Sequence, residues 1–511
     1  MINSEILSSK SNIFIISILL CTIILGAVLR FYTLDKKTFW EDEGAIIGCA
    51  KYNLQMYVHP PLYVRMISVI LKVFGESQFI ARLLSVFSGI LFLPLIYIFC
   101  RDFYNRETAI YTTIFSSVSA YAVQSSQELR MYITSGLFTL GTIYFGWKFI
   151  EHAYKFSNGD VSKKHYFYLV FYKLFSLVGV YTMHSTFISM LVINLCYIIF
   201  IRWKFIWSWV IAHFIIILLY LPQLQTTLIQ SRGYHAGVHL NYFNPLYFLS
   251  NLASFLTGYI FLPLQFTALN VINGSISMIM LYVLVTVITI ISLFFGILYM
   301  KTDSLKLFFI VTNYLFPQIF FMSILLPPNH MVVLQPLLVS FILFGLLKLK
   351  KILFWTVFII LISLNVIALD KYYEDDQYIF YPEDWKKIVE IIEEKEEPGD
   401  SVYIGGNRNG LFTFRYYYKG SLDSRTYLEE KDLYVLQKNF RRSRINVKEE
   451  LMKTFFKSKR LWIVSLSNDP HLIPIIQNFK GKYSIEEYDI PETMKVVLVD
   501  KKKPLMIPLQ H

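Results

Sequence analysis

The sequence predicts a polytopic α-helical membrane protein that ends in an α/β domain outside the membrane. Its 511 residues are 55% hydrophobic and only 16% charged, with a mean hydropathy of +0.48, whereas soluble domains carry about 25% charged residues. The apolar residues gather into runs long enough to cross a bilayer, which takes about 17–25 residues. From residue 370 onward the chain holds 24 basic and 24 acidic residues, as a soluble domain would. These features exclude a soluble enzyme and a disordered chain, and the four scattered cysteines exclude a disulfide scaffold.

The net charge of +12 indicates membrane topology and not a nucleic-acid partner. Residues 1–369 hold 24 basic and 12 acidic residues, so the whole excess lies in the apolar part of the chain. An excess of Lys and Arg in short loops between spans marks the cytoplasmic side. Five loops of this kind occur, with bases at 101–106, 155–164, 202–204, 301–306 and 348–351. We therefore expect a lipid bilayer as the environment and no nucleic acid as a partner.

Eleven apolar runs are predicted to span the membrane. The first, 12–28, is interpreted as an uncleaved anchor and not as a signal peptide, because it is long and no small-residue cleavage site follows it. The others lie at 80–100, 108–123, 131–150, 166–183, 185–201, 205–221, 277–299, 307–326, 331–347 and 352–368.

A twelfth run, 246–264, is broken by Gly258 and Pro263. If it is a re-entrant or surface helix, all five basic loops share the cytoplasmic side, and the C-terminal domain lies outside. If it spans, the last three spans invert. We expect about 11–13 transmembrane helices, with residues 1–369 as the membrane domain, an external loop over 32–78, and residues 370–511 as the external domain.

The C-terminal segment has an α/β pattern. Pro382-Glu383-Asp384 opens a predicted helix with Trp385, Ile388 and Ile392 on one face, and Pro398-Gly399 ends it. Short apolar runs at 401–404, 461–466 and 495–499 predict strands, and helix-like stretches separate them. This alternation is typical of a small α/β domain.

The acidic triplet Glu41-Asp42-Glu43 follows the first span. Like charges this close raise the pKa of at least one carboxyl, which suits a general base. A solvated acidic loop is the alternative interpretation. Carboxylate oxygens also suit a divalent cation, although nothing in the spacing requires one.

Two basic positions on the same predicted external side could bind phosphate. His59 precedes Pro60-Pro61, and these prolines open a predicted helix over 62–74 that is too short to span and ends at Gly75. A histidine at a helix N-terminus could donate to a phosphate, or could be an ordinary surface residue. Arg130 offers a planar fork suited to phosphate, or could pair with Glu128 or extend to lipid headgroups.

Other polar residues on this side predict no metal or nucleotide site. His235 and His239 have the spacing of a zinc pair, but Gly237 lies between them and makes a helix doubtful. The glycine-rich segment 405–410 lacks the full dinucleotide and phosphate-loop patterns, so we interpret it as a turn. We therefore predict no nucleotide cofactor.

The order of these motifs resembles the GT-C superfamily of integral membrane glycosyltransferases. The resemblance is to the branch of protein mannosyltransferases that use dolichyl-phosphate-mannose and of aminoarabinose lipid A transferases (glycosyltransferase family 39 and relatives). It covers about residues 12–350. The motifs that carry it are Trp40-Glu41-Asp42-Glu43, His59-Pro60-Pro61-Leu62-Tyr63, Arg82-Leu83-Leu84-Ser85, Ser126 to Tyr132, and Tyr181 to His184.

The resemblance implies an inverting transfer, on the external side of the cell (inner) membrane, of a sugar from a polyprenyl-phosphate donor to a hydroxyl acceptor on a glycan, lipid or protein. Asp42 matches the catalytic base, with Glu43 positioning the acceptor or Asp42. The other positions in its motifs that would bind substrate are His59, Arg130, Glu128, Tyr132, Tyr63 and His184. Arg232 and His330 lie on the same predicted external side and are further substrate-binding candidates by residue type. Many members have an Arg-Tyr pair where this chain has Asn329-His330.

A polyprenyl-lipid flippase or other polytopic transporter is the alternative function. It would call for charges near the middle of the membrane and for paired halves with broken helices. The predicted spans are nearly free of acidic residues, and the polar clusters gather on one side. This distribution favours a reaction site at one membrane surface.

Overall fold

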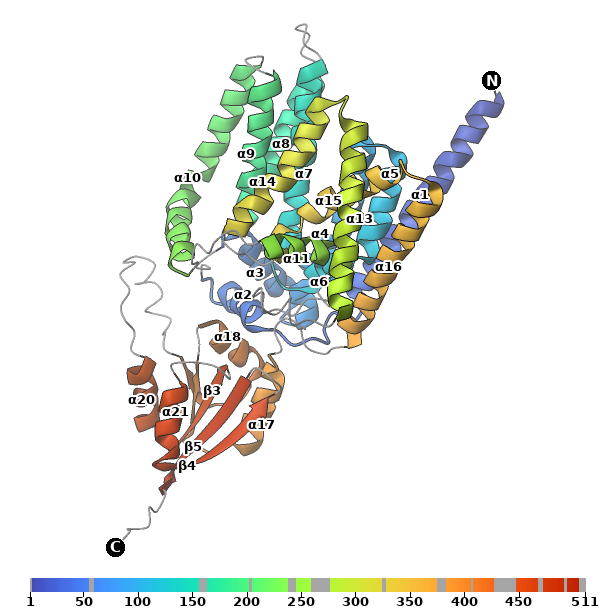
Figure 1. The fold of residues 1–511 in the computed structure, drawn as a ribbon. Coiled ribbons are helices and arrows are strands. Elements are labelled where there is room, and N and C mark those ends of the chain that lie inside the picture. Colours follow the sequence, from blue (N-terminus) through green and yellow to red (C-terminus); the bar gives the residue numbers. More distant parts are fainter. Residues whose placement is uncertain are drawn as a thin grey trace. The chain divides into compact units, whose positions relative to one another are not determined.

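The structure is a computed structural model, and it describes most of the chain (Figure 1). The described residues are 2–54, 59–155, 163–201, 205–237, 245–258, 276–323, 328–374, 383–405, 408–426, 447–466, 472–490 and 494–504. The chain forms two compact units. The first consists of Met1–Leu34, Val58–Tyr63 and Arg82–Glu374, and the second of Asp35–Tyr57, Val64–Ala81 and Asp375–His511. The division at residue 370 remains a prediction, but segments of the predicted external loop belong to the same compact unit as the C-terminal segment.

The first unit is helical. Its elements are α1 (Ile2–Phe31), α4 (Gln78–Phe103, whose first turn lies in the second unit), α5 (Arg106–Val118), α6 (Ala120–Gln127), α7 (Tyr132–Lys155), α8 (Lys163–Thr182), α9 (Thr186–Cys196) with the π-turn η1 (Tyr197–Ile201), α10 (Ile206–Gly237), α11 (Pro245–Thr257), α13 (Ile276–Met300), α14 (Ser304–Ser323), the 3-10 turn η3 (Pro328–Met331), α15 (Leu334–Leu346) and α16 (Lys351–Glu374). Within the described ranges, four helices are long and apolar enough to cross a membrane: Ile13–Phe31, Gln78–Phe103, Ile206–Leu228 and Lys351–Glu374.

The predicted span over 108–123 is wrong as one helix. It divides at Ser119, whose backbone is extended between α5 and α6. The Ser119 hydroxyl accepts from the Ala122 N–H, and the Asn365 side-chain oxygen accepts from the Ala120 N–H. A serine that caps a helix start, with a buried amide satisfying the next N–H, breaks an apolar run without a proline or glycine.

The twelfth apolar run begins as α11, which ends before Gly258 at a φ of +77°. Residues 251–257 are all buried. A helix of 13 residues rises about 20 Å, less than the about 30 Å of a bilayer core. Over its described part, the run therefore favours the re-entrant alternative over a surface helix.

The second unit contains an α/β domain. Its elements are α2 (Glu41–Lys51), most of α3 (Leu62–Phe74), α17 (Trp385–Lys395), β1 (Ser401–Ile404), α18 (Arg408–Tyr417), β2 (Asp423–Arg425), α20 (Val447–Lys457), β3 (Arg460–Leu466), α21 (Ile473–Lys480), β4 (Tyr483–Ile490) and β5 (Met494–Pro504). The strand order is β2-β1-β3-β5-β4. β1 pairs in parallel with β2 and β3, whereas β5 pairs antiparallel with β3 and β4. The predicted α/β class of the C-terminal segment is confirmed.

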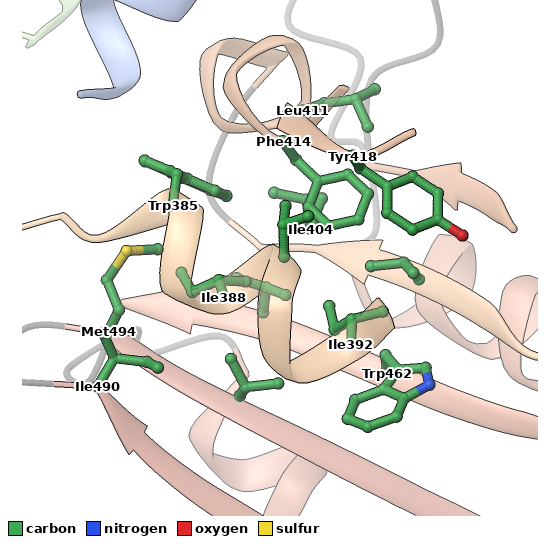
Figure 2. Close-up of a cluster of buried hydrophobic side chains, with 14 of the residues drawn as sticks. Trp385, Ile388, Ile392, Ile404, Leu411, Phe414, Tyr418, Trp462, Ile490 and Met494 are labelled. Carbon is green, nitrogen blue, oxygen red and sulfur yellow. The ribbon is translucent and has the colours of Figure 1, made fainter. Parts of the chain in front are cut away.

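Alternating side chains give this sheet a core on each face. Trp462 and Val464 of β3 belong to one core, together with residues of α17 and α18 (Figure 2). Leu461 and Ile463 of the same strand belong to the other core, together with residues of α20 and α21. Successive strand residues point to opposite faces, so each face of the sheet has an apolar surface, and helices cover both faces.

Candidate functional site

Four basic residues from distant parts of the chain meet in the first unit. We call His59, Arg130, His184 and His330 the basic cluster. The rings of His59 and His330 lie 6.3 Å apart, and the ring of Tyr132 lies 4.7 Å from that of His330. Nη2 of Arg130 donates to the Tyr132 hydroxyl over 2.9 Å. His184 lies close enough to act electrostatically on His59. The structure thus brings together residues that the sequence predicted as substrate-binding.

The turn that carries Arg130 is held by its neighbours. α6 ends at Gln127, and the carbonyl of the following residue, Glu128, accepts from the Arg130 N–H over 2.8 Å. The Glu128 carboxylate accepts from the Gln124 side chain over 3.1 Å. The Tyr63 hydroxyl bonds Ser85 at 2.7 Å, and Ser85 donates to the Arg130 carbonyl at 3.2 Å. Tyr63 and Glu128 therefore support the turn, which fixes where the Arg130 backbone lies.

Burial and like charge act together on His59. The side chain is 3% exposed, and burial lowers its pKa well below the usual value, with further lowering from Arg130, His330 and His184. A positive field of this kind disfavours a protonated imidazole. An anion placed among these residues would reverse the field and favour the protonated form. The electrostatics of the basic cluster therefore suit an anionic group.

The acidic triplet forms the first turn of α2 and is not a solvated loop, so that alternative interpretation is wrong. Glu43 is fully buried, and the α2 N-terminus is capped from elsewhere in the second unit. The Glu383 carboxylate accepts from the Glu41 N–H and from the Trp385 indole, each over 2.8 Å. Nδ2 of Asn409 donates to Oδ1 of Asp42 over 3.1 Å. Carboxylates are favoured at a helix N-terminus by the helix dipole.

Within the acidic triplet, the fold raises the pKa of the Glu41 carboxyl. Burial raises it to about 8, helped by the negative charges of Glu383 and Asp42, while the Gly410 N–H lowers it by donating to the Glu41 carboxylate. Burial also raises the pKa of Glu383. The triplet therefore contains a carboxyl with a raised pKa, but burial contributes more to this shift than the like charge that the sequence indicated. Within the described ranges, no group of three His, Cys, Asp or Glu residues is arranged to hold a metal ion.

Glu41 should make the protein less stable as the pH rises. Its folded-state pKa of about 8 lies above the ordinary 4.5, so the folded state keeps a proton that the unfolded state releases. The stabilisation is complete below about pH 4.5 and is lost as the pH rises through about 8. We expect the Tm of the detergent-purified protein to fall by a few degrees between pH 6 and 9, and Glu41→Gln to remove most of that fall.

The control for this prediction is Glu449→Gln. Glu449 is an exposed residue that pairs with Lys453 on α20, so its replacement should leave the pH dependence unchanged. Tryptophan fluorescence during thermal unfolding provides the measurement. Identical pH curves for the wild type and Glu41→Gln would contradict the prediction.

The other predicted site residues are not part of the basic cluster. Asp42 and Glu43 belong to the second unit, and the basic cluster to the first. Arg232 lies in α10, but its side chain is outside the described part of the structure, as is that of His235; His239 lies outside it altogether.

Asn409 is the residue that sequence reasoning missed. The segment 405–410 was expected to be a turn, but Arg408 to Gly410 already form the start of α18. The spacing of Leu411, Phe414 and Tyr418 is that of a helix face. This pattern could have revealed a helix that begins near Asn409.

Comparisons with known proteins agree with this architecture. The family model described as dolichyl-phosphate-mannose-protein mannosyltransferase matches residues 58–225. The structure of ArnT from Cupriavidus metallidurans bound to undecaprenyl phosphate is similar with a TM-score of 0.59 and 12% identity, over 94% of this chain and 97% of that chain. Its apo form gives a TM-score of 0.60 at 12% identity, over 96% and 98%.

An archaeal enzyme shares the fold as well. The Archaeoglobus fulgidus oligosaccharyltransferase, in a complex with zinc and sulfate, gives a TM-score of 0.54 at 11% identity, over 93% of this chain and 72% of that chain. A comparison with curated protein sequences gives no match. At these identities, the structural similarities show a common fold.

Proposed function

We propose that the chain is an inverting glycosyltransferase of the GT-C type, because its fold is similar to those of ArnT and the archaeal oligosaccharyltransferase and because the mannosyltransferase family model matches residues 58–225. It moves a sugar from a polyprenyl-phosphate donor to an acceptor hydroxyl. The observation that carries the proposal is the basic cluster. His59, Arg130 and His184 all lie within the segment that the family model matches.

The basic cluster would bind the phosphate of the donor. Arg130 supplies a planar fork of N–H donors that suits phosphate oxygens. His59 is buried beside it, where a phosphate would favour the protonated imidazole. As the sugar leaves, negative charge grows on the phosphate, and donors already in place stabilise it without reorganisation. The similar ArnT structure contains undecaprenyl phosphate, a lipid phosphate of the class proposed here.

Asp42 would be the general base. It takes the proton of the acceptor hydroxyl while that oxygen forms a bond to the anomeric carbon. The bond from this carbon to the phosphate oxygen breaks, and the polyprenyl phosphate leaves with the electron pair. The attack from the opposite side inverts the configuration. Glu43, buried next to Asp42, would keep the first turn of α2 in place.

The reaction would occur on the extracytoplasmic side of the cell (inner) membrane. The five basic loops support this orientation by the positive-inside rule. The acceptor, whether glycan, lipid or protein, would approach from the extracytoplasmic side. The C-terminal domain would lie on that same side of the membrane. The polyprenyl chain of the donor would remain in the bilayer.

The test is release of lipid phosphate. The purified protein is incubated in vesicles with a panel of radiolabelled undecaprenyl-phosphate sugars and an extract of envelope glycans, lipids and proteins as acceptors. Formation of free undecaprenyl phosphate together with a labelled acceptor supports the proposal. Donor that stays intact but changes leaflet would indicate a flippase and overturn it.

Lipid-phosphate binding should become tighter as the pH falls. Burial and the neighbouring positive charges lower the pKa of His59, and a bound phosphate would raise that pKa. Binding therefore takes up a proton, and the affinity for undecaprenyl phosphate should increase by up to about tenfold per pH unit between pH 8 and 6. Scintillation proximity with labelled undecaprenyl phosphate measures the Kd.

Two variants distinguish the protonation of His59 from the protonation of the phosphate group itself. His59→Gln should bind more weakly and lose the gain at low pH. His152→Gln should behave like the wild type, because His152 lies in the last turn of α7, about 30 Å along the helix from Tyr132. The same pH dependence in His59→Gln as in the wild type would contradict the prediction.

A further inference from the structure

The α2 helix, which carries the acidic triplet, packs directly on α18 of the C-terminal segment. A Cβ atom at Gly44 would lie 1.8 Å from Oγ1 of Thr413, and one at Gly48 would lie 2.2 Å from the Phe412 ring. The two glycines lie about one turn apart on α2, and a side chain at either position would clash with α18. The position of Asp42, at the start of α2, is therefore set by α18.

α18 is itself fixed to the sheet. Leu411 and Phe414 lie on one of its sides, Tyr418 directly follows it, and all three belong to the core that covers β1 and β3 (Figure 2). Asn409 and Thr413 lie one helical turn apart on another side, together with Phe412. Because α18 packs on the sheet with one side and on α2 with another, it can support the position of α2.

The first turn of α18 donates to two carboxylates of the triplet. The Gly410 N–H donates to the Glu41 carboxylate. The Asn409 side chain donates to Oδ1 of Asp42 over 3.1 Å. An ionised carboxylate only accepts hydrogen bonds, so the nitrogen of the amide faces Asp42 and its oxygen does not.

We propose that Asn409 is a positioning residue for Asp42, so that the C-terminal segment orients the carboxylate that removes the acceptor proton. This inference rests on the proposed function. Rotation about the terminal χ2 bond of an aspartate is soft, and a hydrogen bond to Oδ1 selects one orientation of the carboxylate plane. Oδ2 then takes the proton of the acceptor hydroxyl as the new glycosidic bond forms and the bond to phosphate breaks. A misplacement of about 1 Å in such a group costs about 10²-fold in rate.

The test compares Asn409→Ala with the wild type, using the donor of the undecaprenyl-phosphate panel that the wild type cleaves. We expect kcat to fall by about 10²-fold, with the KM for the donor unchanged. Asn409→Asp should lose more activity, because it places a second negative charge against Asp42.

Two controls separate positioning from folding. Asn478→Ala removes an exposed amide from α21 in the same unit and should change neither kcat nor the KM for the donor. Undecaprenyl phosphate binding reports an intact protein, and Asn409→Ala should bind it as the wild type does.

Each other outcome overturns the inference. An unchanged kcat in Asn409→Ala shows that the hydrogen bond has no catalytic role. A loss of kcat that comes with lost binding and a lower Tm shows a structural role. A wild type that cleaves no donor overturns the proposed function first, and with it the need to orient Asp42.

Discussion

Replacing Asp42 with Asn should abolish glycosyl transfer while the protein still folds. The amide has the shape of the carboxylate but cannot take the acceptor proton, and general-base catalysis contributes about 10²–10⁴-fold to a rate. The Asn409 amide can still bond the side-chain oxygen that remains, so the packing of α2 on α18 should persist. The measurement is release of undecaprenyl phosphate under single-turnover conditions, with the Tm as the test of folding.

Glu41→Gln is the matched control, because it neutralises the neighbouring carboxyl in the same helical turn. Glu41 carries the raised pKa, and a pKa near neutrality is often found in general bases, so the pair of variants decides which carboxyl acts. We expect Glu41→Gln to keep transfer activity. Loss of activity in Glu41→Gln and its retention in a well-folded Asp42→Asn would reverse the assignment.

Replacing Arg130 with Ala should weaken both binding and transfer, with the larger effect on transfer. Removing one preorganised donor to a developing oxyanion costs about 10²–10³-fold in kcat. Arg130 is 2% exposed and held by Tyr132 and the turn after α6, so its guanidinium has little freedom to reorganise. Transfer and Kd for undecaprenyl phosphate are measured on the same preparations.

Arg130→Lys distinguishes charge from geometry. Lysine keeps the charge but loses the planar fork, so binding should recover more than kcat does. Arg101→Ala is the control, since Arg101 is an exposed arginine that pairs with Asp102 and should be neutral. An Arg130→Ala protein with normal kcat and Kd would remove Arg130 from the phosphate site.

Local patterns predicted much of the fold because they depend on neighbours in the chain. The helix predicted over 62–74 forms from Leu62 to Phe74, after Pro60-Pro61 and before Gly75 with its φ of +93°. Three strands of the C-terminal segment also form where short apolar runs predicted them, whereas β2 and β4 were not predicted. The break at Ser119 was missed because the amide that helps it, Asn365, lies far away in the sequence.

The sequence by itself determined that this chain is a membrane protein, because hydropathy over about 20 residues decides whether a helix is stable in lipid. It also determined the order of the motifs that carry the family resemblance. Only the tertiary structure decided that His330 lies beside His59 and that Asn409 bonds Asp42. Such contacts depend on how distant helices pack, and periodicity reports only which face of a helix is apolar, not which partner it meets.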